Sequence, residues 1–130
     1  QNANKEIITL AMIETQQAIN NLDDILSVEN LSGVYIGPAD MSSSYGLLPK
    51  FDVRQDPVFS NIKLIIEKAK KYGKIAGIHN GTTIYAKEML ALGYNLVTVS
   101  SDFRSMSTHA QSIVNEMKNS SEENSESSAY

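Results

Sequence analysis

The chain has 130 residues, of which 42% are hydrophobic and 20% charged, a composition typical of one globular domain with a modest core. Its net charge of −4 offers no basic surface to nucleic acid or an anionic membrane, and no apolar run approaches the roughly 18 residues of a membrane helix. The absence of cysteine excludes disulfides, thiolate metal ligands and a cysteine nucleophile. We expect a cytoplasmic protein with neither nucleic-acid nor membrane partners.

Short apolar runs alternate with stretches of helical periodicity along the chain. Residues 7–13 form an apolar run that ends at Glu14, as expected of a strand buried on both faces of a parallel sheet. Apolar residues at helical spacing follow over 18–26, and a second strand is predicted at 33–36. The polar segment 41–56 is predicted to be a long loop, and such loops in compact domains are often functional.

The second part of the chain repeats the same alternation. The predicted elements are a helix that Pro57 opens and Gly73 ends, a strand over 75–78, a helix over 83–92, a strand over 96–99 and a final helix whose apolar face runs from Phe103 to Met117. From residue 119 the chain is Ser, Glu and Asn almost to its end, which predicts a disordered polar tail over 119–130.

Four successive βα units predict an α/β fold with parallel strands joined by right-handed crossovers. A complete TIM-type (β/α)8 barrel needs about 250 residues and eight such units, so four units are half of one. We therefore expect residues 1–118 to be half a barrel, with an N-terminal portion missing. The structural alternative is an open α/β sheet, which would expose an edge strand at each side.

Polar side chains stand where the predicted strands end, which is where α/β barrels carry their active sites. These residues are Glu14, Asp40, His79 and Asp102. A single carboxylate after a strand is more often a helix N-cap than a ligand, and we expect Asp102 to cap the final helix. Glu14 and Asp40 follow neighbouring strands, which lie roughly 5 Å apart, so both could hold one octahedral cation. His79 either contacts substrate or is a loop histidine without a chemical role.

The segment Gly-Pro-Ala-Asp at 37–40 adds a second element to this site. A glycine and a proline at a strand end shape a tight turn, which would direct the amides of Ala39 and Asp40 into the site. Amides at such a turn can hold a carboxylate without any side chain. An ordinary turn with an Asx cap is the alternative.

Four strings carry a resemblance to a known family. They are Met-Ile-Glu-Thr at 12–15, Gly-Val-Tyr-Ile-Gly-Pro-Ala-Asp-Met-Ser at 33–42, Gly-Lys-Ile-Ala-Gly-Ile at 73–78 and Ala-Leu-Gly-Tyr-Asn-Leu-Val-Thr-Val at 91–99. In these strings the chain resembles the hydroxy-oxo-heptanedioate aldolase/citrate lyase family, and the resemblance covers nearly all of the sequence before the polar tail. That family consists of (β/α)8 barrels, and the resemblance implies that this chain is the C-terminal half of one.

The resemblance implies a metal-dependent (class II) pyruvate aldolase, a carbon–carbon lyase that cleaves a 4-hydroxy-2-oxo acid to pyruvate and an aldehyde. Glu14 and Asp40 match the metal ligands, and Ala39 and Asp40 match the residues whose amides hold the substrate carboxylate. The metal would be Mg²⁺, Mn²⁺ or Co²⁺, chelating the 2-oxo acid and stabilising the enolate of pyruvate. A Schiff-base mechanism is disfavoured, because Lys5 and Lys74 precede their strands.

The chain also departs from the family pattern. The family's general-base histidine and its enolate-stabilising arginine belong to the first half of the barrel, so we expect this chain alone to be inactive. Met12 stands where several relatives carry glutamine near the substrate. Arg54, in the long loop, is a candidate for selecting an acidic substrate.

The resemblance implies that the last helix packs on a neighbouring subunit of a homo-oligomer, with packing on its own barrel as the alternative. Two other functions stay open. One is a citrate or malyl-CoA lyase-like enzyme, which would share the barrel and the paired carboxylates. The other is a non-catalytic half-barrel that acts as a binding or assembly module.

Overall fold

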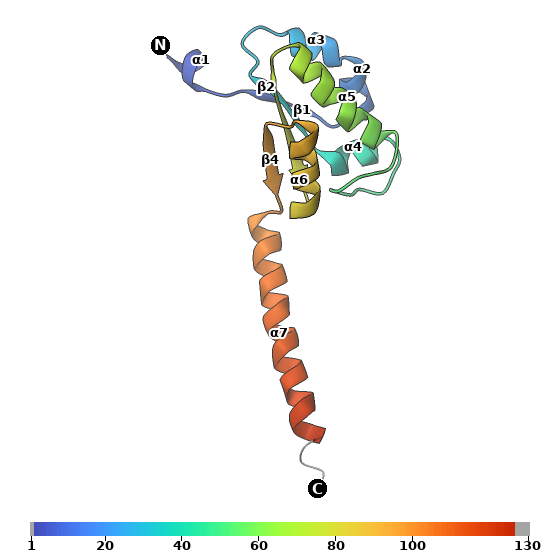
Figure 1. The fold of residues 1–130 in the computed structure, drawn as a ribbon, viewed down its shortest axis with the longest axis vertical. Coiled ribbons are helices and arrows are strands. Elements are labelled where there is room, and N and C mark those ends of the chain that lie inside the picture. The colour runs from blue at the N-terminus through green and yellow to red at the C-terminus, as the bar shows by residue number, and fades with distance from the viewer. Residues whose placement is uncertain (1, 127–130) are drawn as a thin grey trace. The chain divides into compact units, whose positions relative to one another are not determined.

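The computed structural model describes residues 2–126, which divide into two compact units, one up to Val99 and one from Ser100 onward. The first unit is built around a parallel sheet with strand order β1-β2-β3-β4 (Figure 1). Its strands are β1 (Leu10–Ile13), β2 (Gly33–Ile36), β3 (Ile75–Asn80) and β4 (Leu96–Val99). Its helices are α1 (Ala3–Glu6), α2 (Gln16–Asn20), α3 (Leu22–Ser27), α4 (Pro38–Ser44), α5 (Val58–Lys71) and α6 (Thr83–Leu92). The predicted α/β fold with a parallel sheet is confirmed.

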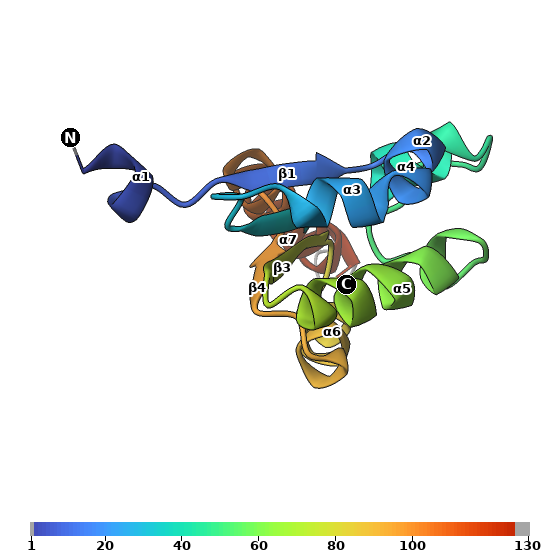
Figure 2. The ribbon, with the colours of Figure 1, turned by 90° about the horizontal axis from the view of Figure 1, so that it is seen from above.

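The core lies between one face of the sheet and the helices that follow its strands. Helices α5 and α6 lie along the same side of the strands (Figure 2). Because successive side chains of a strand point to opposite faces, Ile36 and Ile78 both face these helices, and both are completely buried. Ile62 and Ile65 of α5 pack against this face and are equally buried. The other face includes Met12, which is 51% exposed.

Strand β1 is shorter than the apolar run that predicted it. Ile7 and Ile8 lie outside the strand and are 65% and 67% exposed. The reason is the length of the neighbouring strand, since Gly33, the first residue of β2, already pairs with Leu10. A strand needs a partner for its backbone groups, and an apolar run alone does not supply one.

The segment 41–56 was predicted to be a loop, but it begins inside helix α4, which runs to Ser44. Pro38 occupies the first turn, where its missing N–H costs nothing. The hydroxyls of Ser42 and Ser43 donate to the carbonyls of Pro38 and Ala39, so these polar residues are satisfied within the helix. The predicted helix over 18–26 is also divided, into α2 and α3.

The second unit is helix α7 (Asp102–Glu126). The hydroxyl of Ser101 accepts from the amide of Arg104, so Ser101 occupies the N-cap position, while the carboxylate of Asp102, the first helical residue, accepts from the amide of Phe103. The helix continues to Glu126 through part of the predicted tail 119–130, and its glutamates are favourable helix residues. Residues 127–130 of that tail lie outside the described residues. The two compact units meet after Val99, and the predicted extent of the half-barrel domain, residues 1–118, stays a prediction.

Candidate active site

Glu14 and Asp40 border the same small space at the ends of β1 and β2. Ile13 pairs with Ile36, so Glu14 and Gly37 are the next residues along the two strands. A β-carbon built on Gly37 would lie 2.8 Å from Oε2 of Glu14 and 3.5 Å from Oδ2 of Asp40. The space is open because residue 37 has no side chain, and Asp40 reaches it from the first turn of α4.

The donor set of this space fits a hard divalent cation. Both side chains offer carboxylate oxygens, the ligands that Mg²⁺ and Mn²⁺ prefer. In the described part of the chain, no cluster of three or more His, Asp or Glu side chains is placed to hold a metal. A pair is nevertheless sufficient for Mg²⁺, which is usually held by one or two carboxylates with water and substrate oxygens completing its shell.

The N-terminus of α4 lies beside the same carboxylate pair. The amide of Met41 donates to the carbonyl of Gly37 over 2.9 Å and closes the first turn of the helix. The amides of Ala39 and Asp40 precede that bond and belong to the donors that every helix N-terminus leaves without an intrahelical acceptor. No side chain among residues 2–126 caps this terminus. These two amides are therefore hydrogen-bond donors without an acceptor within the helix, and they belong to Asp40 itself and to the residue before it.

His79 lies within β3, one residue before the strand ends, rather than after the strand as predicted. The strand is longer because its last four residues, including His79 and Asn80, pair with β4. Nδ1 of His79 lies 2.9 Å from Oγ1 of Thr98, its partner in the register. The imidazole also meets the ring of Phe51 edge-on, with 5.0 Å between the ring centroids. Two contacts thus hold the ring.

Glu14, Gly37, His79 and Thr98 form one row across the four strands, which we call the site row. His79 pairs with Thr98, while Glu14 and Gly37 directly follow the pair Ile13 and Ile36. Side chains of one row point to the same face of a sheet. Glu14 and His79 are two strands apart, roughly 10 Å at the usual strand spacing, with Gly37 between them. Sequence analysis selected three of these four residues, and the structure brings them together.

Comparison with known proteins identifies the family of the chain. The sequence model of the HpcH/HpaI aldolase/citrate lyase family matches residues 1–109. The chain belongs to this family.

Two curated relatives of this chain are named aldolases. The hydroxypyruvate/pyruvate aldolase of Rhizorhabdus wittichii is 38% identical over 112 residues, which are 86% of this chain and 45% of that protein. The 4-hydroxy-2-oxo-heptane-1,7-dioate aldolase of Shigella flexneri is 35% identical over 121 residues, which are 93% of this chain and 45% of that protein. The chain therefore spans about half the length of the curated relatives it matches.

Solved structures of the family share the fold. The HpcH/HpaI aldolase from Desulfitobacterium hafniense DCB-2 superimposes with a TM-score of 0.81 at 23% identity, covering 88% of this chain and 44% of that one. The citrate lyase beta subunit from M. tuberculosis, complexed with oxaloacetate and magnesium, has a TM-score of 0.61 at 15% identity, covering 74% and 48%. Among residues 2–126 of this family member, no helix is long and apolar enough to cross a membrane.

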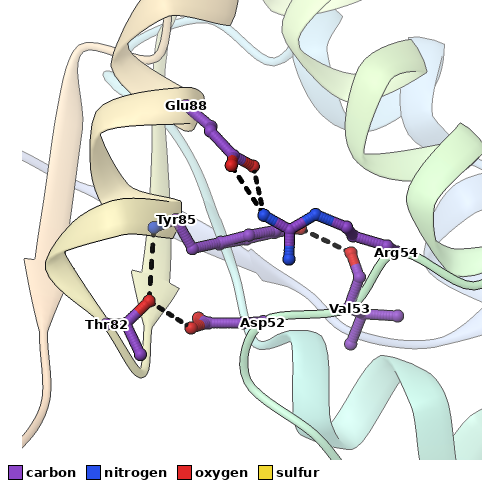
Figure 3. Close-up of polar contacts among 6 residues, drawn as sticks. All are labelled: Asp52, Val53, Arg54, Thr82, Tyr85 and Glu88. Carbon is purple, nitrogen blue, oxygen red and sulfur yellow. Dashed lines mark hydrogen bonds and ion pairs between the residues drawn. The ribbon is translucent and has the colours of Figure 1, made fainter.

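The long loop between α4 and α5 is held at the start of α6 by hydrogen bonds to Asp52, one of which Figure 3 shows. The carboxylate of Asp52 accepts from the amide of Gly81 over 2.7 Å and from the hydroxyl of Thr82 over 2.6 Å. Thr82 in turn caps α6, because its hydroxyl accepts from the amide of Tyr85. Phe51, the residue before Asp52, is thereby held beside His79.

A second set of contacts fastens the next two loop residues to α6 (Figure 3). The hydroxyl of Tyr85 donates to the carbonyl of Val53 over 2.6 Å. Nη2 of Arg54 lies 2.6 and 2.7 Å from the two carboxylate oxygens of Glu88, and its guanidinium lies over the Tyr85 ring. Arg54, a candidate for selecting an acidic substrate, is thus paired with Glu88. We call these contacts, with those of Asp52, the loop latch.

A cavity of about 330 Å³ opens beside this loop, and its lining includes Lys50, Asp52 and Arg54. Neither Glu14 nor Asp40 lines it. The carboxylate pair therefore stands outside this hollow.

Sequence reasoning missed Thr98, a member of the site row, and Tyr35, which contacts it. Tyr35 of β2 forms a hydrogen bond between its hydroxyl and Oγ1 of Thr98 on β4. To reach it, Tyr35 crosses β3 above Gly77, where a β-carbon would lie only 2.7 Å from Cδ2 of the tyrosine. Strand alternation places Tyr35 on the face that carries His79, but no local signal marks a partner two strands away.

Proposed function

We propose that this chain is the C-terminal half of a TIM-type (β/α)8 barrel, and that the intact protein is a metal-dependent pyruvate aldolase. Such a carbon–carbon lyase cleaves a 4-hydroxy-2-oxo acid to pyruvate and an aldehyde. The carrying observation is that Glu14 and Asp40 direct their carboxylates toward one space above Gly37. Family membership supports the reaction class, and the coverage of 45% of each aldolase relative supports the half-barrel.

The residues take separate roles in this proposal. Glu14 and Asp40 would hold the divalent cation, which supplies Lewis-acid chemistry to the 2-oxo acid when bound. The choice among Mg²⁺, Mn²⁺ and Co²⁺ is left open by two carboxylates, since all three accept oxygen ligands. The backbone amides of Ala39 and Asp40 would bind the substrate carboxylate, and His79 would contact the substrate from the other side of Gly37.

Among the described residues, we identify no acid–base pair next to Glu14 and Asp40 that could transfer protons to and from a substrate. We therefore expect this chain alone to bind metal and pyruvate but not to turn over, because aldol cleavage needs a base for the C4 hydroxyl. The base and a cationic group would come from four preceding βα units. A homo-oligomer formed through α7 and a cytoplasmic location stay predictions.

A citrate lyase-like enzyme is the second candidate, supported by the fold shared with a citrate lyase beta subunit. The identities favour the aldolase, at 38% against 15% for that subunit. A non-catalytic half-barrel is the third candidate, and it would bind neither cation nor 2-oxo acid at the carboxylate pair.

Metal binding to the chain tests the proposal directly. Calorimetric titration with Mn²⁺, followed by pyruvate, should show one metal site and pyruvate binding that requires the metal. Glu14→Gln and Asp40→Asn should each abolish both. Glu29→Gln removes the same charge from an exposed residue outside the site and should bind like the wild type. Retention of metal binding in both site variants would refute the assignment.

A chain that also carries the first four βα units extends the test to activity. Pyruvate release from a 4-hydroxy-2-oxo acid should disappear with a chelator and with Asp40→Asn. Activity that survives both changes would mean that the reaction does not depend on this metal site.

A further inference from the structure

Three side chains from three strands form a hydrogen-bonded chain on the face of the sheet that carries the site row. Tyr35 of β2 bonds to Thr98 of β4, and Thr98 bonds to Nδ1 of His79 on β3. Gly77 lies beneath the tyrosine and makes this crossing sterically feasible, since any side chain there would meet the Tyr35 ring. The ring of Phe51 contacts the imidazole edge-on.

The proton inventory of these three side chains favours one direction of the hydrogen bonds. Tyrosine and threonine hydroxyls each carry one proton, and a neutral imidazole carries one on either nitrogen. If Nδ1–H of His79 donated to Thr98, Thr98 would donate to Tyr35, and the phenol proton would need a further acceptor. Among the described residues, Tyr35 has no hydrogen-bond partner besides Thr98. That order leaves the stronger acid of the two hydroxyls without an acceptor.

In the opposite order, both hydroxyl protons have an acceptor within the chain of three side chains. Tyr35 donates to Thr98, Thr98 donates to Nδ1 of His79, and the imidazole proton resides on Nε2. Because Nδ1 is directed to Thr98 on β4, Nε2 lies on the part of the ring directed away from that strand. Within the described part of the chain, Nε2 has no hydrogen-bond partner, so its N–H is available to a ligand.

We propose that Tyr35 and Thr98 hold His79 as the neutral Nε2–H tautomer, so that His79 donates a hydrogen bond to the 4-oxygen of a bound 4-hydroxy-2-oxo acid. This inference rests on the proposed function. Gly37 separates Glu14 from His79 in the site row and has no side chain. A ligand above Gly37 would have its 2-oxo acid end at the carboxylate pair and its next oxygen on the side of His79.

The assignment gives His79 a role in substrate selection. A donor on the far side of Gly37 contacts the part of the substrate that becomes the aldehyde and leaves pyruvate untouched. Tyr35 and Thr98 act through His79 and are positioning residues.

Nuclear magnetic resonance of the isotopically labelled chain tests the tautomer without metal or substrate. The chain has two histidines, and His109→Gln removes the other one, leaving the His79 ring nitrogens alone in the spectrum. Near neutral pH we expect the proton on Nε2. Tyr35→Phe and Thr98→Val should each produce a mixture of tautomers, whereas Tyr45→Phe, which removes a hydroxyl elsewhere in the same unit, should not. An Nδ1–H tautomer in the otherwise unchanged chain would overturn the proposal.

Calorimetry with the Mn²⁺-loaded chain tests the donor role. His79→Leu should weaken binding of 4-hydroxy-2-oxopentanoate roughly fivefold, the usual effect of one neutral hydrogen bond, and leave pyruvate binding unchanged. His79→Gln, whose amide N–H can occupy the Nε2 position, should restore most of the loss. Equal weakening of both ligands, or of neither, would overturn the role. Failure of the wild type to bind Mn²⁺ or pyruvate would instead refute the proposed function, and the donor role with it.

Discussion

At the scale of single residues, Gly37 matters for its missing β-carbon and not for its backbone conformation. Its φ of −99° and ψ of 90° are accessible to any L-residue, so Gly37→Ala should not strain the chain. The new methyl group would lie 2.8 Å from Oε2 of Glu14 and displace that carboxylate. We expect Mn²⁺ affinity to fall by at least about tenfold in a calorimetric titration.

Ser43→Ala is the matched control for this substitution, because it changes an exposed residue of the same helix α4. It should leave the metal affinity as it is, and both variants should melt within a few degrees of the wild type. Wild-type metal binding by Gly37→Ala would show that the space above residue 37 is not the metal site.

Two buried tyrosines make stability depend on pH in the alkaline range. Burial raises the pKa of Tyr85 to about 12 and also raises the pKa of Tyr94. Tyrosines of the unfolded chain ionise near pH 10, so above that pH the unfolded state loses protons that the folded state keeps. The contribution of these tyrosines to the free energy of unfolding is therefore fully present below about pH 10. The free energy of unfolding should fall as the pH rises toward 12.

Urea unfolding at intervals from about pH 8 to 12 measures this dependence. Tyr85→Phe should be less stable by about 1 kcal/mol at pH 8, because its hydroxyl no longer donates to Val53, and should show a shallower alkaline fall. A wild-type free energy that stays level up to pH 12 would contradict the raised pKa values.

At the scale of elements, the loop latch determines whether Phe51 stays beside His79. Asp52→Asn should cost about 2 kcal/mol, because two hydrogen bonds to a charged carboxylate at the start of α6 are weakened. Hydrogen exchange of the amides over 45–57 should accelerate in the same variant, since the loop loses its anchor. Both effects can be followed by mass spectrometry and thermal melting.

Glu88→Gln is the comparison within the same latch. Its pair with Arg54 is about half exposed on both sides, and exposed ion pairs contribute on the order of 0.5 kcal/mol. We therefore expect only a small change in loop exchange. An equal effect of the two substitutions would mean that Asp52 is not the main anchor.

The elements differ in how well the sequence predicts them. Strands β2 and β4 are short apolar runs beside glycine or asparagine turns, and α6 ends at Gly93 with a φ of 106°, so local signals suffice. The serines of α4 lower its helix propensity, so the sequence predicts a loop there, and their hydrogen bonds to the preceding turn account for the helix.

The candidate site divides in the same way. Glu14 and Asp40 could be selected because each follows the end of a neighbouring strand, a relation that the order of elements alone predicts. The contact of Tyr35 with Thr98 joins residues 63 positions apart, and the loop latch joins residues about 30 apart. Such contacts depend on the register of the sheet and the path of the loop, which no local pattern encodes.

At the scale of the whole molecule, this chain has apolar surfaces that a partner would bury. In the sheet, β1 and β4 are outer strands, and Met12 on its second face is 51% exposed. Helix α7 by itself carries an exposed apolar face that includes Phe103, Ile113 and Met117. Surfaces of this kind drive association in water.

Sedimentation velocity should therefore find dimers or larger species at micromolar concentrations. A triple variant with Phe103→Ser, Ile113→Ser and Met117→Ser tests the contribution of α7 to association. The monomer fraction should rise if that helix forms the interface. Association that persists in this variant would point to the open sheet. A monodisperse wild-type monomer would contradict the half-barrel.

The site row links function to the accuracy of folding. Glu14, Gly37 and His79 face the same side only because β1, β2 and β3 pair in one register. A slip of β1 by a single residue would turn Glu14 toward the helices and bring Ile13 into the row. A mispaired chain could still be compact and helical, yet it could not capture a cation with both carboxylates. The metal-binding stoichiometry would thus report the fraction of molecules in a preparation whose strands pair in the correct register. Circular dichroism and apparent size would not detect that fraction.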